Sequence, residues 1–279
     1  MKPAIVTKIS ELRARVAEWR REGARVGLVP TMGALHEGHL SLVREMDARA
    51  ERVIVSIFVN PTQFAPHEDF GRYPRTLDAD CGKLGAQGLA DLVFAPSAVE
   101  MYPDGFATKI EVGGPAAGLE TDFRPHFFAG VATIVSKLLI AAMPDVAIFG
   151  EKDYQQLLVI RRMVADLALP IEIPGGVTMR EPDGLALSSR NAYLNADERK
   201  IAGQLNRILK DVATRARANI ADAEAAGRDA LLNAGFNSVD YVAVRDAATL
   251  KPITRLDAPA RVLAAVKIGS TRLIDNLAI

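Results

Sequence analysis

Apolar runs rich in β-branched residues alternate with helical periodicity along the first two-thirds of the chain. The apolar runs predict strands at residues 26–29, 53–59, 92–95, 146–149 and 171–173. Between them, apolar residues recur every three or four positions and predict helices, the first of which we expect Ser10 to cap and Gly23 to end. This alternation is typical of a parallel α/β sheet with helices on both faces.

The pattern changes near Gly175 and Gly176. Asn195 and Glu198 can begin a helix as a capping-box-like pair, and an apolar stripe at helical spacing follows them. An alanine-rich helix comes next, before strand-like runs at 239–244, 261–266 and 272–274. Helices followed by strands predict a smaller α+β domain. We therefore divide the chain into residues 1–178 and residues 179–279.

The residue counts favour a small-molecule ligand and a reducing compartment. Lys and Arg together number 34, as do Asp and Glu, so no overall field attracts a polyanion such as nucleic acid. Cys81 is the single cysteine, which excludes an internal disulfide. No apolar run approaches the roughly 20 residues that span a bilayer, and the N-terminus predicts no signal peptide. We expect a cytoplasmic protein that binds neither nucleic acid nor membrane.

Polar clusters follow three of the predicted strands, at the point where each strand ends. Residues 30–33 follow the first strand, residues 60–63 the second, and residues 150–153 the strand at 146–149. Open parallel sheets bind ligands beyond the carboxyl ends of their strands. The repeated placement predicts one crevice that all three clusters line.

The motif His36-Glu37-Gly38-His39 lies where a helix should begin after the first strand. The two histidines are three residues apart and can point the same way, while free N–H groups of a first helical turn favour an anion. The motif predicts a phosphate cradle and resembles the His-x-Gly-His motif of adenylyl-transferring enzymes. Two alternatives stay open: a zinc site, for which no third ligand is evident, and a pair of structural histidines that cap the helix.

Three further groups are candidates for the same crevice. Lys152 can neutralise phosphate and Asp153 can accept hydrogen bonds from ribose hydroxyls, unless both are solvated surface charges. Asn60 and Gln63 suit a hydroxylated substrate, although Asn-Pro also opens ordinary turns. The sequence Ser-Ser-Arg-Asn at 188–191 offers a second phosphate site, or else forms a linker or helix cap.

Five longer stretches resemble one enzyme family, the pantothenate synthetases. They read PTMGALHEGHLSLV at 30–43, VSIFVNPTQF at 55–64, EDFGRYPRTL at 68–77, FGEKDYQQ at 149–156 and DGLALSSRN at 183–191. Agreement continues to LIDN at 273–276, so the resemblance covers essentially the whole chain. It implies a Rossmann-like domain and the two-step, Mg-ATP-dependent condensation of pantoate with β-alanine. In that reaction pantoyl adenylate forms with release of pyrophosphate, and the β-alanine amine then displaces AMP.

The resemblance also implies roles for individual residues. His36 and His39 would hold the phosphates in the transition state, and the triphosphate would bind Lys152, Ser188, Ser189 and Arg190. ATP would further contact Pro30, Met32, Gly150 and Asp153. The substrate pocket would contain Met32, Asn60, Gln63 and Gln156, with Tyr73 on a flexible wall over it. The family pattern implies a homodimer and leaves the Mg²⁺ ligands undefined.

Two stretches depart from the family pattern. Where Arg-Pro-x-His-Phe-Arg-Gly-Val is usual, residues 124–131 place Phe127 at the histidine and Ala129 at the second arginine. His126 is adjacent, but a shift of one residue changes the direction of a side chain, so the role is not transferred to it. Residues 174–178 read Pro-Gly-Gly-Val-Thr instead of a Val-Pro-Thr-like segment, which affects the expected backbone contacts to adenine.

Two other functions fit the same residues. One is an adenylyl- or nucleotidyltransferase with a different acceptor, which would differ around Met32, Gln63 and Gln156. The other is a nucleotide-binding protein that has lost turnover through the changes at Phe127 and Ala129. Added pantoate should speed ATP consumption by the ligase, whereas a pure binder would consume none.

Overall fold

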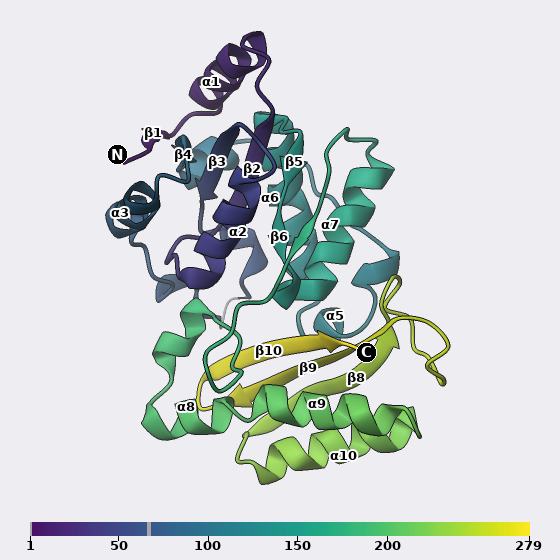
Figure 1. Ribbon diagram of the computed structural model, residues 1–279. Helices are drawn as coiled ribbons and strands as arrows, with labels where there is room; N and C mark the ends of the chain where they lie inside the picture. The colour runs from purple at the N-terminus through teal and green to yellow at the C-terminus, as the bar shows by residue number, and fades with distance from the viewer. Residues whose placement is uncertain (1, 66–67) are drawn as a thin grey trace.

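A computed structural model describes residues 2–65 and 68–279 (Figure 1). In this part of the chain five parallel strands form one sheet, in the order β1-β4-β3-β2-β5. The strands are β1 (Ala4–Val6), β2 (Val26–Thr31), β3 (Arg52–Ile57), β4 (Leu92–Phe94) and β5 (Val146–Ala147). The predicted parallel sheet is confirmed, and β1 is a short edge strand that the sequence pattern did not predict.

Alternate residues of the central strands face opposite sides of this sheet. Leu28, Ile54 and Phe94 belong to a buried cluster on one face, while Val29 and Val55 belong to a second cluster on the other face. The first cluster includes side chains of α1 (Ile9–Arg21), α6 (Phe127–Ala142) and α7 (Tyr154–Asp166), and the second includes those of α2 (Glu37–Asp47) and α3 (Leu77–Gln87). Helices therefore cover both faces, as predicted.

Short segments connect the sheet to the rest of the molecule. Strand β6 (Phe149–Gly150) pairs in parallel with β7 (Gly175–Gly176), beside the main sheet. The predicted strand at 171–173 is reduced to a single bridge between Glu172 and Val146. The remaining short helical segments are η1 (Pro61–Gln63), η2 (Asp69–Gly71), α4 (Ala98–Met101), η3 (Gly114–Ala116), α5 (Glu120–Phe123), η4 (Glu151–Asp153) and η5 (Ser189–Tyr193).

The C-terminal part contains helices followed by an antiparallel sheet. Helices α8 (Ala196–Ala202), α9 (Leu205–Ala216) and α10 (Ile220–Asn233) precede strands β8 (Ser238–Asp246), β9 (Ala260–Ile268) and β10 (Thr271–Ala278). The sheet order is β10-β9-β8, and α9 and α10 cover one of its faces (Figure 1). This is the α+β arrangement that the sequence predicts.

Two helix starts show how local hydrogen bonds decide the boundaries. The capping box of Asn195 and Glu198 begins α8 as predicted, but the helix ends at Ala202 with Gly203 as its C-cap, and α9 starts separately at Leu205. The prediction that Ser10 caps the first helix is wrong. Helix α1 begins at Ile9, and Glu11 accepts the N–H groups of Thr7 and Lys8 at 3.0 and 3.1 Å. No helix in the described part of the chain is long and apolar enough to cross a membrane.

Candidate active site

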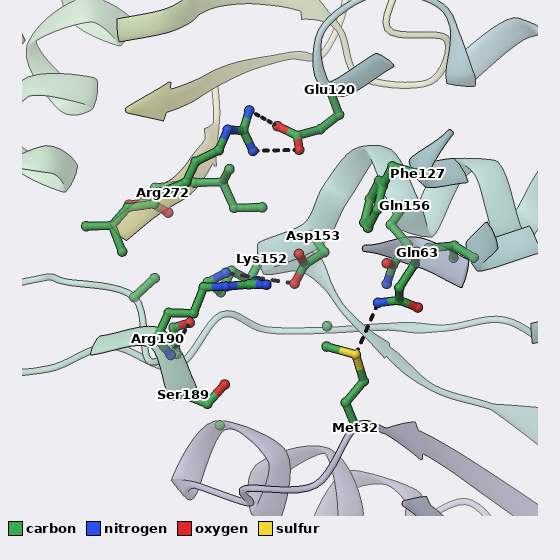
Figure 2. Close-up of a pocket in the computed structure, with 18 of the residues that line it drawn as sticks. Met32, Gln63, Glu120, Phe127, Lys152, Asp153, Gln156, Ser189, Arg190 and Arg272 are labelled. Atoms are coloured by element: carbon green, nitrogen blue, oxygen red, sulfur yellow. Dashed lines mark hydrogen bonds and ion pairs between the residues drawn. The ribbon is translucent and has the colours of Figure 1, made fainter. Parts of the chain in front are cut away.

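A cleft of about 470 Å³ lies between the carboxyl ends of the parallel strands and the C-terminal sheet (Figure 2). The three polar clusters that follow β2, β3 and β6 all line it, so the prediction of a single crevice is confirmed. Every candidate residue named from the sequence lines this cleft: Pro30, Met32, His36, His39, Asn60, Gln63, Tyr73, Gly150, Lys152, Asp153, Gln156, Ser188, Ser189 and Arg190.

Hydrogen bonds fix the turn that leads from β2 to the histidine motif. Thr31 donates its hydroxyl to the Ser56 carbonyl at 2.8 Å, and its Oγ1 accepts the Gly33 N–H. The fully buried carboxylate of Asp80 accepts the N–H groups of Ala34 and Leu35 at 3.0 and 2.8 Å. Because this turn is held at both ends, the helix α2 that follows it starts at a defined position in the cleft.

The imidazoles of His36 and His39 use the same ring atom to cap α2. Nδ1 of His36 accepts the Gly38 N–H at 3.1 Å, and Nδ1 of His39 accepts the His36 N–H at 3.3 Å. A neutral ring whose Nδ1 accepts must carry its proton on Nε2. The capping interpretation is therefore correct, and capping leaves an Nε2–H donor on each of two rings whose centroids are 4.0 Å apart.

Both histidines are held in the neutral form. Burial, with the nearby positive charge of Lys152 as a second cause, lowers the pKa of His36 to about 4. Burial, followed by the charges of His36 and Lys152, lowers the pKa of His39 to about 3. Two neutral donors thus face a site that Lys152 already makes positive.

These lowered pKa values predict an acid-dependent loss of stability. Below the unfolded-state pKa of about 6.5, the two imidazoles bind protons in the unfolded chain but remain unprotonated in the folded chain. Above about pH 6.5 the titration of the two rings therefore does not change the free energy of unfolding. As the pH falls from there towards 4, it lowers the free energy of unfolding progressively. Urea titrations between pH 7.5 and 4.5 should show a smaller acid-dependent loss in a His36→Asn, His39→Asn protein. Equal acid dependence in the two proteins would contradict the assignment.

A zinc site is not what this geometry provides. In residues 2–65 and 68–279, no group of three or more His, Cys, Asp or Glu side chains is arranged to hold a metal ion. The zinc interpretation therefore lacks the ligands that it requires in the part of the chain that is described.

Asn60 and Gln63 form part of the wall of the cleft. The Asn60 amide, 1% exposed, donates to Gln63 Oε1 at 3.1 Å and to the Gly130 carbonyl at 3.3 Å. Its oxygen accepts the Tyr102 hydroxyl at 2.7 Å. Gln63 in turn directs its amide nitrogen to the sulfur of Met32 at 3.1 Å (Figure 2). Asn60 thus opens the turn at η1 and also orients Gln63.

Lys152 and Asp153 follow β6 on the short helical turn η4. The Lys152 side chain is only 21% exposed, and its Nζ lies 3.9 Å from Asp153 Oδ2 (Figure 2). This burial argues against a solvated surface charge for Lys152. Asp153 is 44% exposed and remains accessible to a polar ligand.

The loop at 188–190 is tied to the wall formed by residues 68–77. The Tyr73 hydroxyl lies 3.1 Å from Ser189 Oγ, and Arg190 makes two hydrogen bonds to Asp69, at 3.0 and 2.9 Å. Although burial raises the pKa of Asp69, the hydrogen bond and charge of Arg190 hold that pKa below its usual value. Ser188 caps η5, so the helix-cap interpretation is correct. Ser188, Ser189 and Arg190 also line the cleft.

The two departures from the family pattern differ in their position. Phe127 lines the cleft, and the Arg124 guanidinium lies over its ring at 3.8 Å. Ala129 is not among the described residues that line the cleft, and His126 is exposed and also outside it. Phe127 is therefore the change that affects the cleft, and His126 does not replace the usual histidine.

The altered segment at 174–178 contains the strand β7. A Cβ on Gly176 would lie 2.1 Å from Leu42 Cδ2, and one on Gly175 would lie 2.8 Å from Leu157 Cδ2. The glycines therefore let β7 lie directly against α2 and α7. Val177 and Thr178 follow and line the cleft.

Sequence reasoning missed a group of buried charges in the same cleft. Glu120 accepts two hydrogen bonds from Arg272 at 2.7 and 2.8 Å (Figure 2), and Arg124 binds Glu68 at 2.6 and 2.8 Å. Glu120 and Arg272 are 152 residues apart, so no motif spacing connects them. Glu68 lies in the family-like stretch at 68–77 and Arg124 occupies the first arginine of the usual Arg-Pro pattern, and those positions were the available signal.

The fold and the cleft together define a class of enzyme. A parallel α/β sheet, two histidine donors at a helix start, a partly buried lysine and an arginine-bearing loop are typical of adenylyl-transferring enzymes that act on nucleotides. Comparison with known proteins identifies the family within that class. The sequence model of the pantoate–β-alanine ligases matches residues 4–278, and the chain belongs to this family.

Individual relatives agree with this assignment over nearly their whole length. The chain is 56% identical to the pantothenate synthetase of Mesorhizobium japonicum over 278 residues, covering 99% of this chain and 98% of the relative. It is similar to the crystal structure of pantothenate synthetase from Thermus thermophilus, with 47% identity, 98% coverage of each chain and a TM-score of 0.92. The Francisella tularensis pantoate–β-alanine ligase, crystallised with β-γ ATP and β-alanine, is 34% identical over 99% of this chain and 97% of that chain, with a TM-score of 0.84.

Proposed function

We propose that this protein joins pantoate to β-alanine at the expense of ATP, through a pantoyl-adenylate intermediate. The observation that carries the proposal is the convergence of two neutral imidazole donors and Lys152 in one cleft. Family membership supports the ligase activity, and the ligands named for the Francisella tularensis relative support ATP and β-alanine as substrates.

In the first step a pantoate carboxylate oxygen attacks the α-phosphorus of ATP, and pyrophosphate leaves. His36 and His39 donate their Nε2–H groups to phosphate oxygens, and Lys152 supplies a positive charge as negative charge builds on the leaving group. Ser188, Ser189 and Arg190 bind the triphosphate. The nucleoside lies along Pro30, Met32, Gly150 and Asp153, with the Asp153 carboxylate accepting from ribose hydroxyls.

In the second step the β-alanine amine attacks the acyl carbon of the adenylate, and AMP leaves. Met32, Gln63 and Gln156 surround the pantoyl group, Asn60 orients Gln63, and Tyr73 closes the wall beside them. Keeping water from the mixed anhydride is the physical reason for a cleft with buried walls.

Mg²⁺ fits this site as the companion of the nucleotide. It is usually held through substrate phosphates, its own waters and one or two carboxylates, whereas the described residues offer no cluster of three potential side-chain ligands. When bound, the cation neutralises phosphate charge beside the histidines and Lys152. The residues named above bind and orient the substrates around it.

The domain assignment and the assembly belong to the same proposal. Residues 1–178 bind ATP and pantoate, and residues 179–279 act as a lid that carries the 188–190 loop and covers the cleft with β10. The C-terminal helices and sheet have a buried cluster of their own, which supports this division, and Ala243 and Leu263 also pack into the cluster of the parallel sheet. The family resemblance supports a homodimer, and the free thiol of Cys81 suits the cytoplasm.

A mass-spectrometric assay with Mg-ATP, pantoate and β-alanine, each omitted in turn, tests the proposal. Pantothenate and AMP should appear only in the complete mixture. AMP formation with a different acid and not with pantoate would show an adenylyltransferase with another acceptor. ATP binding without turnover would indicate that Phe127 has abolished catalysis, and Phe127→His would be the variant to compare.

Replacing Gln63 with leucine should weaken the use of pantoate selectively. The substitution keeps the side-chain size and removes an amide that lines the cleft, where Asn60 and Met32 hold it in place. We expect kcat/KM for pantoate to fall about 10- to 100-fold, as for loss of a hydrogen bond to a charged ligand. The KM for ATP should stay within about twofold in the same steady-state assays. An equal loss towards both substrates would contradict the assignment of Gln63 to the pantoate pocket.

A further inference from the structure

We infer that Asn276, on the last strand of the C-terminal sheet, is a positioning residue for Lys152. This inference rests on the proposed role of Lys152 in binding the transferring phosphates. It assigns to the C-terminal part of the chain a direct share in arranging the first step.

The Asn276 amide holds the backbone on which Lys152 stands. Its nitrogen donates to the carbonyl of Glu151 at 2.9 Å and to the carbonyl of Lys152 at 2.8 Å. Both amide hydrogens are therefore used, and the side chain is 4% exposed. The contact joins β10 to the turn η4, which are 124 residues apart at Lys152.

The orientation of this amide is determined by its other partner. Asn276 Oδ1 accepts from Arg261 Nη1 at 2.5 Å, and a guanidinium can only donate. The oxygen must therefore face Arg261, which leaves the nitrogen facing the two carbonyls. Arg261 also binds Glu151 at 3.1 Å and lies over the Tyr154 ring at 3.6 Å, so it contacts the same turn from β9.

The backbone of Asn276 is itself anchored. Its N–H donates to Asp275 at 2.7 Å, and Arg180 binds that carboxylate with two hydrogen bonds at 2.8 and 2.9 Å. Arg180 also donates to the Asn276 carbonyl at 3.2 Å. The side-chain amide that reaches η4 therefore projects from a backbone that hydrogen bonds with Asp275 and Arg180 hold in place.

Fixing the backbone at this point matters because the lysine side chain is long and flexible. A lysine ammonium on a four-carbon stem binds phosphate as a point charge, and its useful position depends on where the stem begins. Two hydrogen bonds to the carbonyls at 151 and 152 fix that origin. Misplacement of a catalytic group by about 1 Å can reduce a rate about 100-fold.

The test measures single-turnover formation of pantoyl adenylate by variants of the full-length protein. Asn276→Ala should lower this rate about 10- to 100-fold, with the KM for pantoate within about twofold of its original value. In a Lys152→Ala background, the same Asn276→Ala change should alter the rate less than about threefold, because no ammonium is left to position. Asn276→Asp, which has the same size but cannot donate to both carbonyls, should repeat the loss.

Asn206→Ala is the matched control. Asn206 is also a buried amide, 3% exposed, and donates to Asp275 at 3.3 Å in the same network, but it makes no hydrogen bond to the Lys152 turn. The Asn206→Ala protein should lose stability to a similar degree, and its rate of pantoyl-adenylate formation should stay within about twofold of the original rate. Equal rate losses for Asn276→Ala with and without Lys152 would overturn the positioning role, as would normal rates in both Asn276 variants. A normal rate for Lys152→Ala alone would instead show that the proposed role of Lys152 is wrong.

Discussion

Replacing His39 with alanine is expected to lower kcat by about 100-fold or more while the protein stays folded. The ring is neutral, because burial and the charges of His36 and Lys152 lower its pKa to about 3. Its Nδ1 is occupied by the His36 N–H, so its Nε2–H is the donor that remains for a phosphate oxygen. Removing one preorganised donor from such a site typically costs 10²- to 10³-fold. Steady-state ATP consumption with pantoate and β-alanine measures the effect.

His126→Ala is the control for this variant. His126 is also a histidine at the start of a helix, but it is exposed and lies outside the cleft. Its substitution should leave kcat within about twofold, as expected for a surface position. Near-normal turnover by a folded His39→Ala protein would contradict the assignment of the histidine motif to phosphate stabilisation.

Lys152→Ala should have the largest effect, a loss of about 10³-fold in the rate of adenylate formation. The side chain is the cation that most lowers the pKa of His36, and it lies in the cleft with both imidazoles. Charge that stabilises a transferring phosphoryl group in a buried site contributes effects of this size. Quenched-flow measurement of pantoyl adenylate follows the step directly.

The Lys152 variant carries a second, independent readout. Because Lys152 lowers the pKa of His36 and of His39, its removal should raise both pKa values from about 4 and about 3, which NMR titration of the imidazoles can follow. Lys200→Ala, at a side chain that is 79% exposed, should change neither the rate nor these titrations. Unchanged imidazole titrations in the Lys152 variant would show that its ammonium does not face the histidines.

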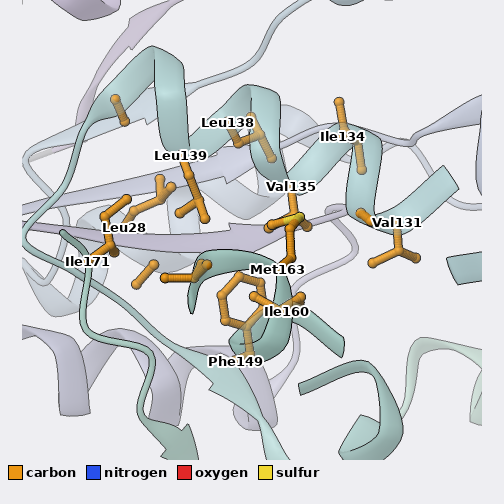
Figure 3. Close-up of a cluster of buried hydrophobic side chains, with 14 of the residues drawn as sticks. Leu28, Val131, Ile134, Val135, Leu138, Leu139, Phe149, Ile160, Met163 and Ile171 are labelled. Carbon is orange, nitrogen blue, oxygen red and sulfur yellow. The ribbon is translucent and has the colours of Figure 1, made fainter. Parts of the chain in front are cut away.

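Some parts of the fold could be predicted because their sequence signal is local. The strands β2, β3 and β4 are short apolar runs, and polar clusters follow β2 and β3, whose ends the sheet places together. Helix α6 is different, because it is buried on nearly every side and shows no polar face. Figure 3 shows Val131, Ile134, Val135, Leu138 and Leu139 of this helix within the buried cluster on that side of the sheet. A uniformly apolar segment carries no periodicity from which to predict a helix.

The candidate site divides in the same way. His36, Lys152 and Arg190 each lie in a contiguous motif, so the sequence could place them in one crevice. The residues that orient these side chains could not be predicted from a contiguous motif, because they lie far away in the sequence. Asp69 binds Arg190 from 121 residues away, and Asn276 binds the Lys152 carbonyl from 124 residues away. Those pairings follow from the docking of the two sheets, which depends on tertiary contacts and not on local spacing.

The close contact between Gly38 and the His36 ring limits how this cleft can be redesigned. A methyl group at position 38 would lie 2.9 Å from Cε1 of His36. Any residue larger than glycine at this position would therefore displace the His36 ring. Position 38 is therefore as restricted as the histidines, although its side chain is a single hydrogen atom. Glu37, its exposed neighbour, points away from the ring and pairs with Arg44. Libraries that alter substrate choice should therefore keep glycine at position 38.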